Sequence, residues 1–380
     1  MNVYVRELAT AIARAGVDCD VYTRAWQRGL PSVVSVEPGF RVHHVPAGPA
    51  ALVARRDLPD LVAEFTDGVL QRMIEQGAPD LIHANYWLSG VAGHDLKHNF
   101  ELPLISTFHT LARVKAEADP EEHERRAEAE ARTIGCSDAI LASSPEERAQ
   151  LEELYGADRD RVEIVPPGVD HDVFSPGEQS DARRALGLGG GPLLLFVGRI
   201  QPLKGAAVAI EALARLPFAD ATLVIVGGPS GPEGNAEMRR LRRLVVSCGV
   251  QKRVRFVAAQ PHEHLAVYYR AADVCLVPSH SESFGLVALE AAACGTPVIA
   301  AAVGGLATIV DDGRTGFLVE DWDPASFAGY ATELLDHPAR AAQMATAASI
   351  EARRYRWSIT AARLRRLYND LAERRLVECP

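Results

Sequence analysis

The sequence predicts an α/β protein whose two halves each contain a parallel sheet covered by helices. Strand-like and helix-like segments alternate along all 380 residues, and such alternation is typical of parallel sheets covered on both faces. The pattern breaks where Pro166, Pro167 and Gly168 are followed by Pro176 and Gly177. A segment dense in Pro and Gly before a new strand indicates a boundary, and the chain is long enough for two domains.

The elements of the first half follow from the spacing of apolar residues. A helix is expected to end at Gly16, and another to begin after Ser144, a capping residue followed by Pro145. The expected helices are 3–15, 59–76, 121–135 and the one from 145, and the expected strands are 17–22, 80–83, 103–106 and 138–142.

The second half repeats the alternation. Its expected strands are 193–197, 222–226, 254–257, 274–277 and 297–300, with a helix over 206–216 and further helices from 324 onward. These patterns predict one domain over residues 1–170 and another over 171–352.

Composition excludes several classes of function. Fifty acidic and 40 basic residues give a net charge of −10, which disfavours a nucleic-acid or anionic-membrane partner. No apolar run is long enough to span a bilayer, and no signal peptide is visible. The six cysteines form no C-x-x-C pair, so we expect reduced, mostly buried thiols and a cytoplasmic location. These cysteines are Cys19, Cys136, Cys248, Cys275, Cys294 and Cys379.

Two histidine pairs are candidates for other chemistry. His94 and His98 have i, i+4 spacing and share a helix face, but they lack the Glu of a zinc-protease helix. We therefore predict no metal site there. His262 and His264 are expected to open a surface helix.

Two carboxylates, Glu282 and Glu290, are the strongest functional signal. The strand 274–277 precedes Glu282, and an apolar helix starting near Gly285 carries Glu290 two turns along. Free N–H groups at that helix start form an anion site for a diphosphate, with hydroxyl-binding carboxylates on either side. This layout fits a nucleotide sugar. The structural alternative is a capping Glu282 and a helix-surface Glu290.

A second loop carries two cations. Arg199 and Lys204 bracket the turn between the strand 193–197 and the helix 206–216. Guanidinium and ammonium groups both suit phosphate, so they would neutralise a departing nucleoside diphosphate. The alternative is a pair of solvated loop charges.

Together, Gly198-Arg199-x4-Lys204 and Glu282-x7-Glu290 resemble the donor site of retaining glycosyltransferases of the GT-B fold (glycosyltransferase family 4, group 1). The resemblance implies two Rossmann-like domains facing across a cleft, with the last helix, in 353–380, crossing back to the first domain. It implies a hexosyltransferase that uses a UDP-sugar. The implied donor-binding residues are Arg199, Lys204, Glu282, Phe284, Gly285, Leu286 and Glu290, and the implied catalytic residues are His109, Arg199, Lys204 and Glu282.

The first half, through Asn2-Val3-Tyr4-Val5, Asn85-Tyr86-Trp87 and Phe108-His109-Thr110, resembles the D-inositol 3-phosphate glycosyltransferases of mycothiol biosynthesis. That subfamily moves N-acetylglucosamine from UDP to a phosphorylated acceptor. The implied acceptor-binding residues are Asn2, Arg55, Tyr86, Thr110 and Arg125, the last as one of the pair Arg125-Arg126. Arg55 stands where the subfamily has Lys.

The resemblance also has implications for the first strand of the fold and for cofactors. The fold normally opens with a strand and a Gly-rich loop before Asn2, so we expect a missing first strand and unpaired neighbouring edges. No cofactor is required. Mg²⁺ near the main chain of Tyr269, Arg270, Ala272 and Thr296 is an alternative, and a homodimer is left open.

Two other functions remain open. One is a sucrose-phosphate-synthase-like transfer to a sugar phosphate. The other is a catalytically impaired protein that only binds a nucleotide sugar.

Overall fold

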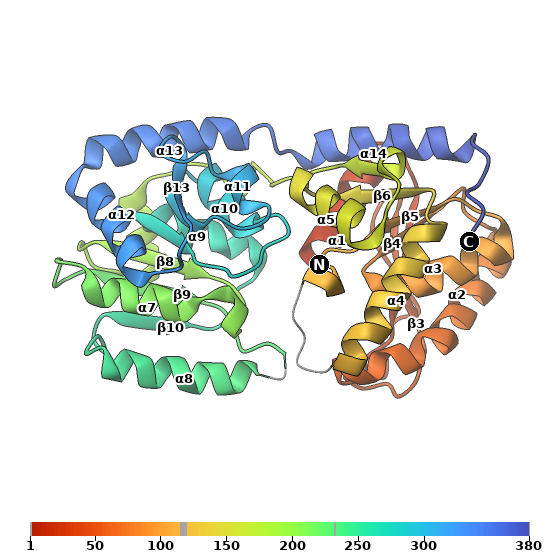
Figure 1. Ribbon diagram of the computed structural model, residues 1–380, viewed down its shortest axis with the longest axis horizontal. Coiled ribbons are helices and arrows are strands. Elements are labelled where there is room, and N and C mark those ends of the chain that lie inside the picture. Colours follow the sequence, from red (N-terminus) through yellow and green to blue (C-terminus); the bar gives the residue numbers. More distant parts are fainter. Residues whose placement is uncertain (1, 115–119, 232, 380) are drawn as a thin grey trace. The chain divides into compact units, whose positions relative to one another are not determined.

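The computed structural model describes residues 2–114, 120–231 and 233–379. The chain forms two compact units, each with its own core (Figure 1). Unit 1 comprises residues 1–168 and 357–380, and unit 2 comprises residues 169–356.

Unit 2 is built on a parallel six-stranded sheet of order β10-β9-β8-β11-β12-β13. Its strands are β8 (Leu193–Val197), β9 (Thr222–Val226), β10 (Val254–Val257), β11 (Val274–Val277), β12 (Val298–Ala301) and β13 (Gly316–Val319). Its helices are α6 (Gln179–Leu186), η4 (Pro202–Lys204), α7 (Ala206–Arg215), α8 (Gly234–Ser247), η5 (His262–His264), α9 (Leu265–Ala271), α10 (Leu286–Ala293), α11 (Leu306–Ile309), α12 (Pro324–Asp336) and α13 (Pro338–Ala352).

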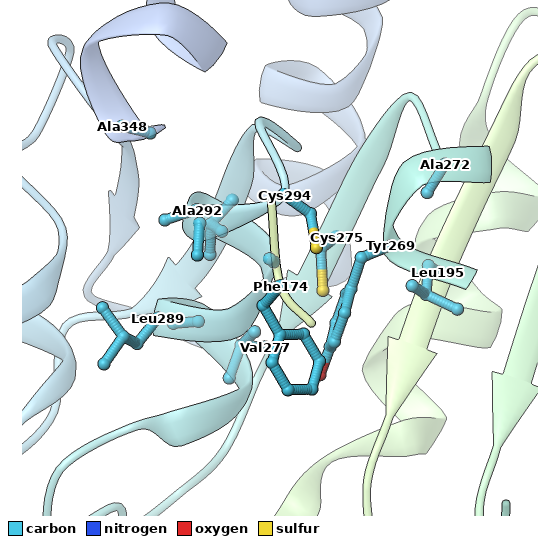
Figure 2. Packing of buried hydrophobic residues seen from close by; sticks show 14 of the residues in the cluster. Phe174, Leu195, Tyr269, Ala272, Cys275, Val277, Leu289, Ala292, Cys294 and Ala348 are labelled. Atoms are coloured by element: carbon cyan, nitrogen blue, oxygen red, sulfur yellow. The ribbon is translucent and has the colours of Figure 1, made fainter. Parts of the chain in front are cut away.

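Both faces of this sheet are covered. Consecutive strand residues point to opposite faces, and in β8 Leu195 joins one apolar cluster while Leu194 joins another. The first cluster packs Phe174 and Tyr269 near the free thiols Cys275 and Cys294 (Figure 2). Strands buried on both faces account for the continuous apolar runs in the sequence.

Unit 1 contains two sheets. The first has order β1-β3-β2, with β2 antiparallel, and the second is the parallel sheet β4-β5-β6-β7. Their strands are β1 (Cys19–Arg24), β2 (Val33–Glu37), β3 (Phe40–Val45), β4 (Ile82–Asn85), β5 (Leu104–Thr107), β6 (Ala139–Ala142) and β7 (Val162–Ile164). The helices are α1 (Asn2–Arg14), η1 (Arg55–Leu61), α2 (Val62–Gln76), α3 (Trp87–Phe100), η2 (Ala112–Val114), α4 (Pro120–Cys136), α5 (Pro145–Tyr155), η3 (Arg159–Arg161) and α14 (Trp357–Ala372). Among the described residues, β1 and β4 are edge strands.

The C-terminal helix α14 packs against α1 in unit 1 (Figure 1). Leu8 and Ile12 of α1 share an apolar cluster with Leu364 and Trp357. A polar contact adds to this packing, since the Tyr368 hydroxyl lies 2.8 Å from Nδ1 of His83 on β4. The last helix is therefore part of the first unit's core.

The predicted α/β class is confirmed, and most predicted elements agree with the structure to within a few residues. Ser144 caps α5 by accepting a hydrogen bond from the Glu147 amide. The pair β2 and β3 was not predicted, and the valines of β2 are exposed and do not belong to the core. None of the described helices is long and apolar enough to span a membrane.

The prediction of reduced thiols is wrong for two cysteines. Cys136 and Cys379 form a disulfide across 243 residues of sequence. Cys19, Cys248, Cys275 and Cys294 are free. Sequence spacing could not reveal the pair, because it depends on the tail after α14 returning to the end of α4.

Truncation of Leu364 tests the role of α14 in unit 1. The side chain is fully buried, so Leu364→Ala should lower the free energy of unfolding by about 2–5 kcal/mol. The matched control is Arg366→Ala on the exposed side of α14, which should change it by less than about 0.5 kcal/mol. Urea denaturation measures both, and equal effects would contradict the packing described.

Candidate functional site

The candidate site in unit 2 lies where the strand order of its sheet reverses. From β8 the chain proceeds to β9 and β10 on one side, and then returns to β11 on the other side of β8. Ligands of open parallel sheets bind beyond the carboxyl ends of the strands at such a switch point. The loops after β8 and β11 carry the predicted cations and Glu282.

Glycine brings these two loops together. Gly205 follows Lys204 with φ of 71°, and a Cβ atom there would lie 2.0 Å from the carbonyl oxygen of Pro278. Only glycine tolerates both the positive φ and the close approach. The His280 amide donates to the Leu203 carbonyl at 2.9 Å, which links the loops directly.

The result is an ion pair at the switch point. Lys204 Nζ lies 2.5 Å from Glu282 Oε2, and the Ser279 hydroxyl donates to the same oxygen at 3.4 Å. The two charged side chains are 18% and 22% exposed, so a ligand can reach both. Arg199 is exposed and has no hydrogen-bond or ion-pair partner among the described residues.

Two further glycines, Gly304 and Gly305, pack against the main chain of Glu282. The Gly305 amide donates to the Glu282 carbonyl at 3.0 Å, and a Cβ on Gly304 would lie 1.9 Å from that carbonyl oxygen. The loop leads through Phe284 to Gly285, the N-cap of α10. No side chain within the described ranges caps this helix, so the amides of its first turn, from Leu286 onward, remain available to an anion.

Glu290 lies inside unit 2. The residue is 5% exposed, which contradicts the alternative of a helix-surface charge. His262 Nε2 lies 2.7 Å from its Oε1 atom, and the Tyr269 hydroxyl donates to Oε2 at 2.8 Å. Burial raises the pKa of Tyr269 well above its usual value, and the nearby Glu290 carboxylate adds to this shift. The sequence predicted neither partner, and His262 is not a plain surface residue.

The main chain proposed to hold Mg²⁺ already has protein partners. The Tyr269 carbonyl accepts hydrogen bonds from the Thr296 hydroxyl at 2.6 Å and from the Ala272 amide at 3.1 Å. The Ala272 carbonyl accepts from Gln179 Nε2 at 3.1 Å. Binding of an ion here requires these contacts to change, and the site stays a prediction.

In unit 1 the predicted residues also follow strands. Tyr86 comes directly after β4, and His109 and Thr110 follow β5. Tyr86 and His109 have φ of 81° and 62°, a conformation that costs non-glycine residues of order 1–3 kcal/mol and clusters at functional sites. Asn2 is exposed at the start of α1.

His109 is held as a neutral ring. Its Nε2 atom lies 3.0 Å from Asn85 Oδ1, and the Tyr4 ring packs edge-on at 4.7 Å between centroids. Burial lowers the pKa of His109 to about 3, with a smaller contribution from His83. His109 is therefore suited to hydrogen bonding and not to acting as a cation.

The structure brings Arg126, and not Arg125, to Tyr86 and Thr110. Arg126 Nη2 donates to the Thr110 carbonyl at 2.7 Å and to its hydroxyl at 3.0 Å. The guanidinium carbons of Arg126 and Arg55 lie 5.4 and 5.9 Å from the centre of the Tyr86 ring. Arg125 is exposed and pairs with Asp60 at 3.1 Å. Its role in acceptor binding stays a prediction.

The Arg126 side chain is buried and bonded within the protein. It is 1% exposed, and its Nε donates to Glu130 Oε1 at 2.7 Å. Glu130 Oε2 in turn accepts from the Ala112 amide at 2.8 Å and from the Tyr155 hydroxyl. Arg126 thus positions Thr110, whereas Arg55 is exposed and accessible to a ligand.

Two glycosyltransferase family models match this chain, one over its first half and one over its second half. The family model described as Glycosyltransferase Family 4 matches residues 1–173, and Glycosyl transferases group 1 matches residues 178–350. The D-inositol 3-phosphate glycosyltransferase of Xylanimonas cellulosilytica is 46% identical, covering 99% of this chain and 92% of that protein.

Solved structures also match this chain, and two of them illustrate the shared fold. Sucrose-phosphate synthase from Thermosynechococcus elongatus matches with a TM-score of 0.90 at 36% identity, over 97% of this chain and 93% of that one. Anabaena Alr3699/HepE, solved in complex with UDP and glucose, matches with a TM-score of 0.75 at 23% identity, over 87% and 86% of the two chains. The second likeness bears on the fold alone.

The buried histidines predict a pH dependence of stability. Burial lowers the pKa of His83 to about 4, below the value near 6.5 of an unfolded His. As pH falls below about 6.5, the unfolded chain takes up a proton that the native chain does not, so stability is lost as pH falls toward 4. His83 should contribute on the order of 2–3 kcal/mol of this loss.

Urea denaturation between pH 7 and 4 should therefore show a shallower pH slope for His83→Gln than for the wild type. The matched control is His337→Gln at an exposed position, which should keep the wild-type slope. Identical slopes in all three proteins would contradict a neutral, buried His83.

Proposed function

Because the chain belongs to the glycosyl transferases of group 1 and family 4, we propose that it moves N-acetylglucosamine from UDP to inositol 3-phosphate with retention of anomeric configuration. The chain is a hexosyltransferase of an α/β, GT-B fold. The donor sugar, the nucleotide, the acceptor and the stereochemistry are the proposed parts. The observation that carries the proposal is the Lys204–Glu282 pair at the switch point of unit 2, beside the N-terminus of α10.

On the donor side, we assign the diphosphate to Lys204, Arg199 and the first-turn amides of α10. Charge grows on the diphosphate as the glycosidic bond breaks, and fixed cations and dipoles stabilise that charge without reorganisation. Glu282 would then accept hydrogen bonds from sugar hydroxyls. Glu290 would accept them from the ribose, through lone pairs that His262 and Tyr269 leave available.

The proposed reaction needs no nucleophile from the protein. The bond between the sugar's anomeric carbon and the phosphate oxygen breaks, and a bond to the acceptor hydroxyl oxygen forms on the same face. The hydroxyl proton passes to the leaving phosphate oxygen, so UDP departs carrying it. His109, held neutral by burial, is the proposed catalytic residue of unit 1 and would act through hydrogen bonds.

On the acceptor side, we assign the phosphate to Arg55, Tyr86 and the Thr110 hydroxyl. Arg126 would act as a positioning residue, since it donates to the carbonyl and to the hydroxyl of Thr110. Asn2 and Arg125 are further proposed contacts. A guanidinium offers two parallel N–H donors to a phosphate, which supports Arg55 in this role.

The cellular setting is also proposed. The enzyme would act in the cytoplasm on two small molecules and require no cofactor, because Arg199 and Lys204 supply the positive charge. Mg²⁺ near Tyr269 and a homodimeric state are alternatives that metal removal and sedimentation would test.

A second candidate is transfer to a hexose phosphate. It is favoured by the match to sucrose-phosphate synthase at 36% identity over 97% of this chain. The two acceptors share a phosphate and differ in the ring, so the phosphate contacts alone do not separate them.

A transfer assay with radiolabelled UDP-N-acetylglucosamine separates these functions. We expect product with inositol 3-phosphate, little with hexose phosphates, and an α-linked product by proton NMR. Product with hexose phosphate alone would favour the second candidate. UDP binding without transfer to any acceptor would indicate a nucleotide-sugar-binding protein and contradict the proposal.

Replacement of Lys204 tests charge stabilisation on the leaving group. Lys204→Met should lower kcat by about 10²–10³ and weaken UDP binding by less than about tenfold, because the charge is greatest in the transition state. The control is Lys252→Met at an exposed position of unit 2, which should match the wild type. Equal losses in kcat and in UDP affinity would contradict this role.

Replacement of Arg55 tests the acceptor phosphate. Arg55→Ala should raise the acceptor KM by at least about tenfold, since a charged hydrogen bond contributes about 1.5–3 kcal/mol, and should leave the donor KM unchanged. Arg56→Ala, at the neighbouring exposed position, is the matched control. Arg125→Ala belongs in the same series, and a larger effect there than at Arg55 would reverse the assignment.

A further inference from the structure

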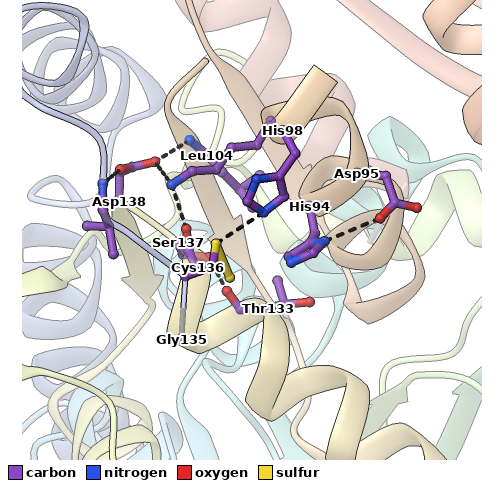
Figure 3. The surroundings of a disulfide bond; sticks show 12 residues. His94, Asp95, His98, Leu104, Thr133, Gly135, Cys136, Ser137 and Asp138 are labelled. Atoms are coloured by element: carbon purple, nitrogen blue, oxygen red, sulfur yellow. Dashed lines mark hydrogen bonds and ion pairs between the residues drawn. A yellow bond between two sulfur atoms is a disulfide. The ribbon is translucent and has the colours of Figure 1, made fainter. Parts of the chain in front are cut away.

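Four residues with metal-binding side chains meet at one place in unit 1. They are His94, His98, Cys136 and Cys379, and their ligand atoms all lie within 4.8 Å of one another. Figure 3 shows both imidazole rings beside the sulfur pair. This cluster plays no part in the transfer chemistry assigned above.

Three separate segments supply the four side chains. His94 and His98 lie one turn apart on α3, with ring centroids 4.7 Å apart. Cys136 is the last residue of α4, and Cys379 lies in the tail after α14. His98 Nε2 is 3.2 Å from Cys379 Sγ. Two His at i, i+4 with two Cys form a common set of ligands for tetrahedral Zn²⁺.

The cluster also has the supporting contacts of a metal site. His94 Nδ1 lies 3.3 Å from Asp95 Oδ1, which leaves Nε2 for an ion, as in carboxylate–histidine–zinc arrangements. Lys97 Nζ donates to the Cys136 carbonyl at 2.8 Å. This contact fixes the end of α4, where Cys136 lies, against α3.

The tail that carries Cys379 is fixed independently of the sulfurs. The Val377 amide donates to Asp138 Oδ1 at 2.7 Å. The other oxygen of Asp138 accepts from Lys97 Nζ at 2.8 Å and from the Leu104 amide at 2.7 Å. Because these contacts hold the tail on α3 and β5, Cys379 stays beside the histidines when the disulfide is reduced.

We propose that the reduced chain binds one Zn²⁺ through His94, His98, Cys136 and Cys379, and that this ion fastens the C-terminal tail to α3 and α4. With four protein ligands the site is closed, which is typical of structural and not catalytic zinc. In a tetrahedral site the sulfurs separate to about 3.8 Å, a distance set by Zn–S bonds of about 2.3 Å.

The disulfide and the zinc site are alternative states of the same sulfurs. A thiol reductant supplies two electrons and two protons, which convert the disulfide into two thiols. Each thiol then releases its proton to water as its sulfur binds the ion. In a reducing compartment such a Cys and His cluster more often binds metal than forms a disulfide. The sequence alone gave no indication of a site at His94 and His98, because the partner ligands proposed here are distant in sequence.

The test uses the full chain, reduced with a phosphine and freed of metal by a chelator that is then removed. Titration with Co²⁺ should produce the d–d bands of tetrahedral cobalt and a thiolate-to-cobalt charge-transfer band, saturating at about one ion per chain. Zn²⁺ should displace Co²⁺ and abolish both bands. The disulfide-oxidised protein should show neither band.

Variants decide which residues bind. Cys379→Ser and His98→Ala should each lose the tetrahedral spectrum and bind Zn²⁺ at least about tenfold more weakly. Cys248→Ser, at a free cysteine of unit 2, is the matched control and should bind as the wild type does. Cys379 lies in the tail after α14 and in none of the apolar clusters, so its replacement leaves both cores intact. The proposal is overturned if the reduced wild type binds no Co²⁺, or if Cys379→Ser and His98→Ala keep the wild-type spectrum and affinity.

Discussion

The candidate site of unit 2 depends on the close approach of the loops that follow β8 and β11. Gly205 passes against the Pro278 carbonyl, where a Cβ would lie 2.0 Å from oxygen, and Gly304 passes against the Glu282 carbonyl in the same way. These contacts bring Lys204 to Glu282, three residues before Gly285, the N-cap of α10. The charged groups are therefore arranged by backbone packing before any ligand binds, which is the preorganisation that electrostatic catalysis needs.

In unit 1, buried polar groups fix the positions of side chains near the predicted site residues. His83 lies between the hydroxyls of Thr107 and Tyr368, each at 2.8 Å, and connects α14 with the sheet. Arg126 and Glu130 form a buried pair that positions Thr110. Such buried pairs add little net stability, but removing one partner leaves an uncompensated buried charge. The pair therefore fixes the position of Thr110 more than it stabilises the fold.

The sequence predicted most helices and strands well, because the spacing of apolar residues and the positions of Pro and Gly are local properties. Strands β8 and β11 agree with the predicted 193–197 and 274–277, and the loops carrying Lys204 and Glu282 follow them. Contacts between distant segments could not be predicted. No local signal connects His262 with Glu290, Arg126 with Thr110, or Cys379 with Cys136. The alternative of a helix-surface Glu290 rests on the helix sequence alone. Contacts with Tyr269 on α9 and with His262 bury this carboxylate and exclude that alternative.

The most direct measurement is a crystal structure of the full chain with UDP. Our account predicts that the diphosphate lies within hydrogen-bond distance of Lys204 Nζ and the first-turn amides of α10, with the ribose hydroxyls at Glu290. A nucleotide bound with its diphosphate away from Lys204 and α10 would contradict the account, whatever sugar or acceptor the enzyme uses.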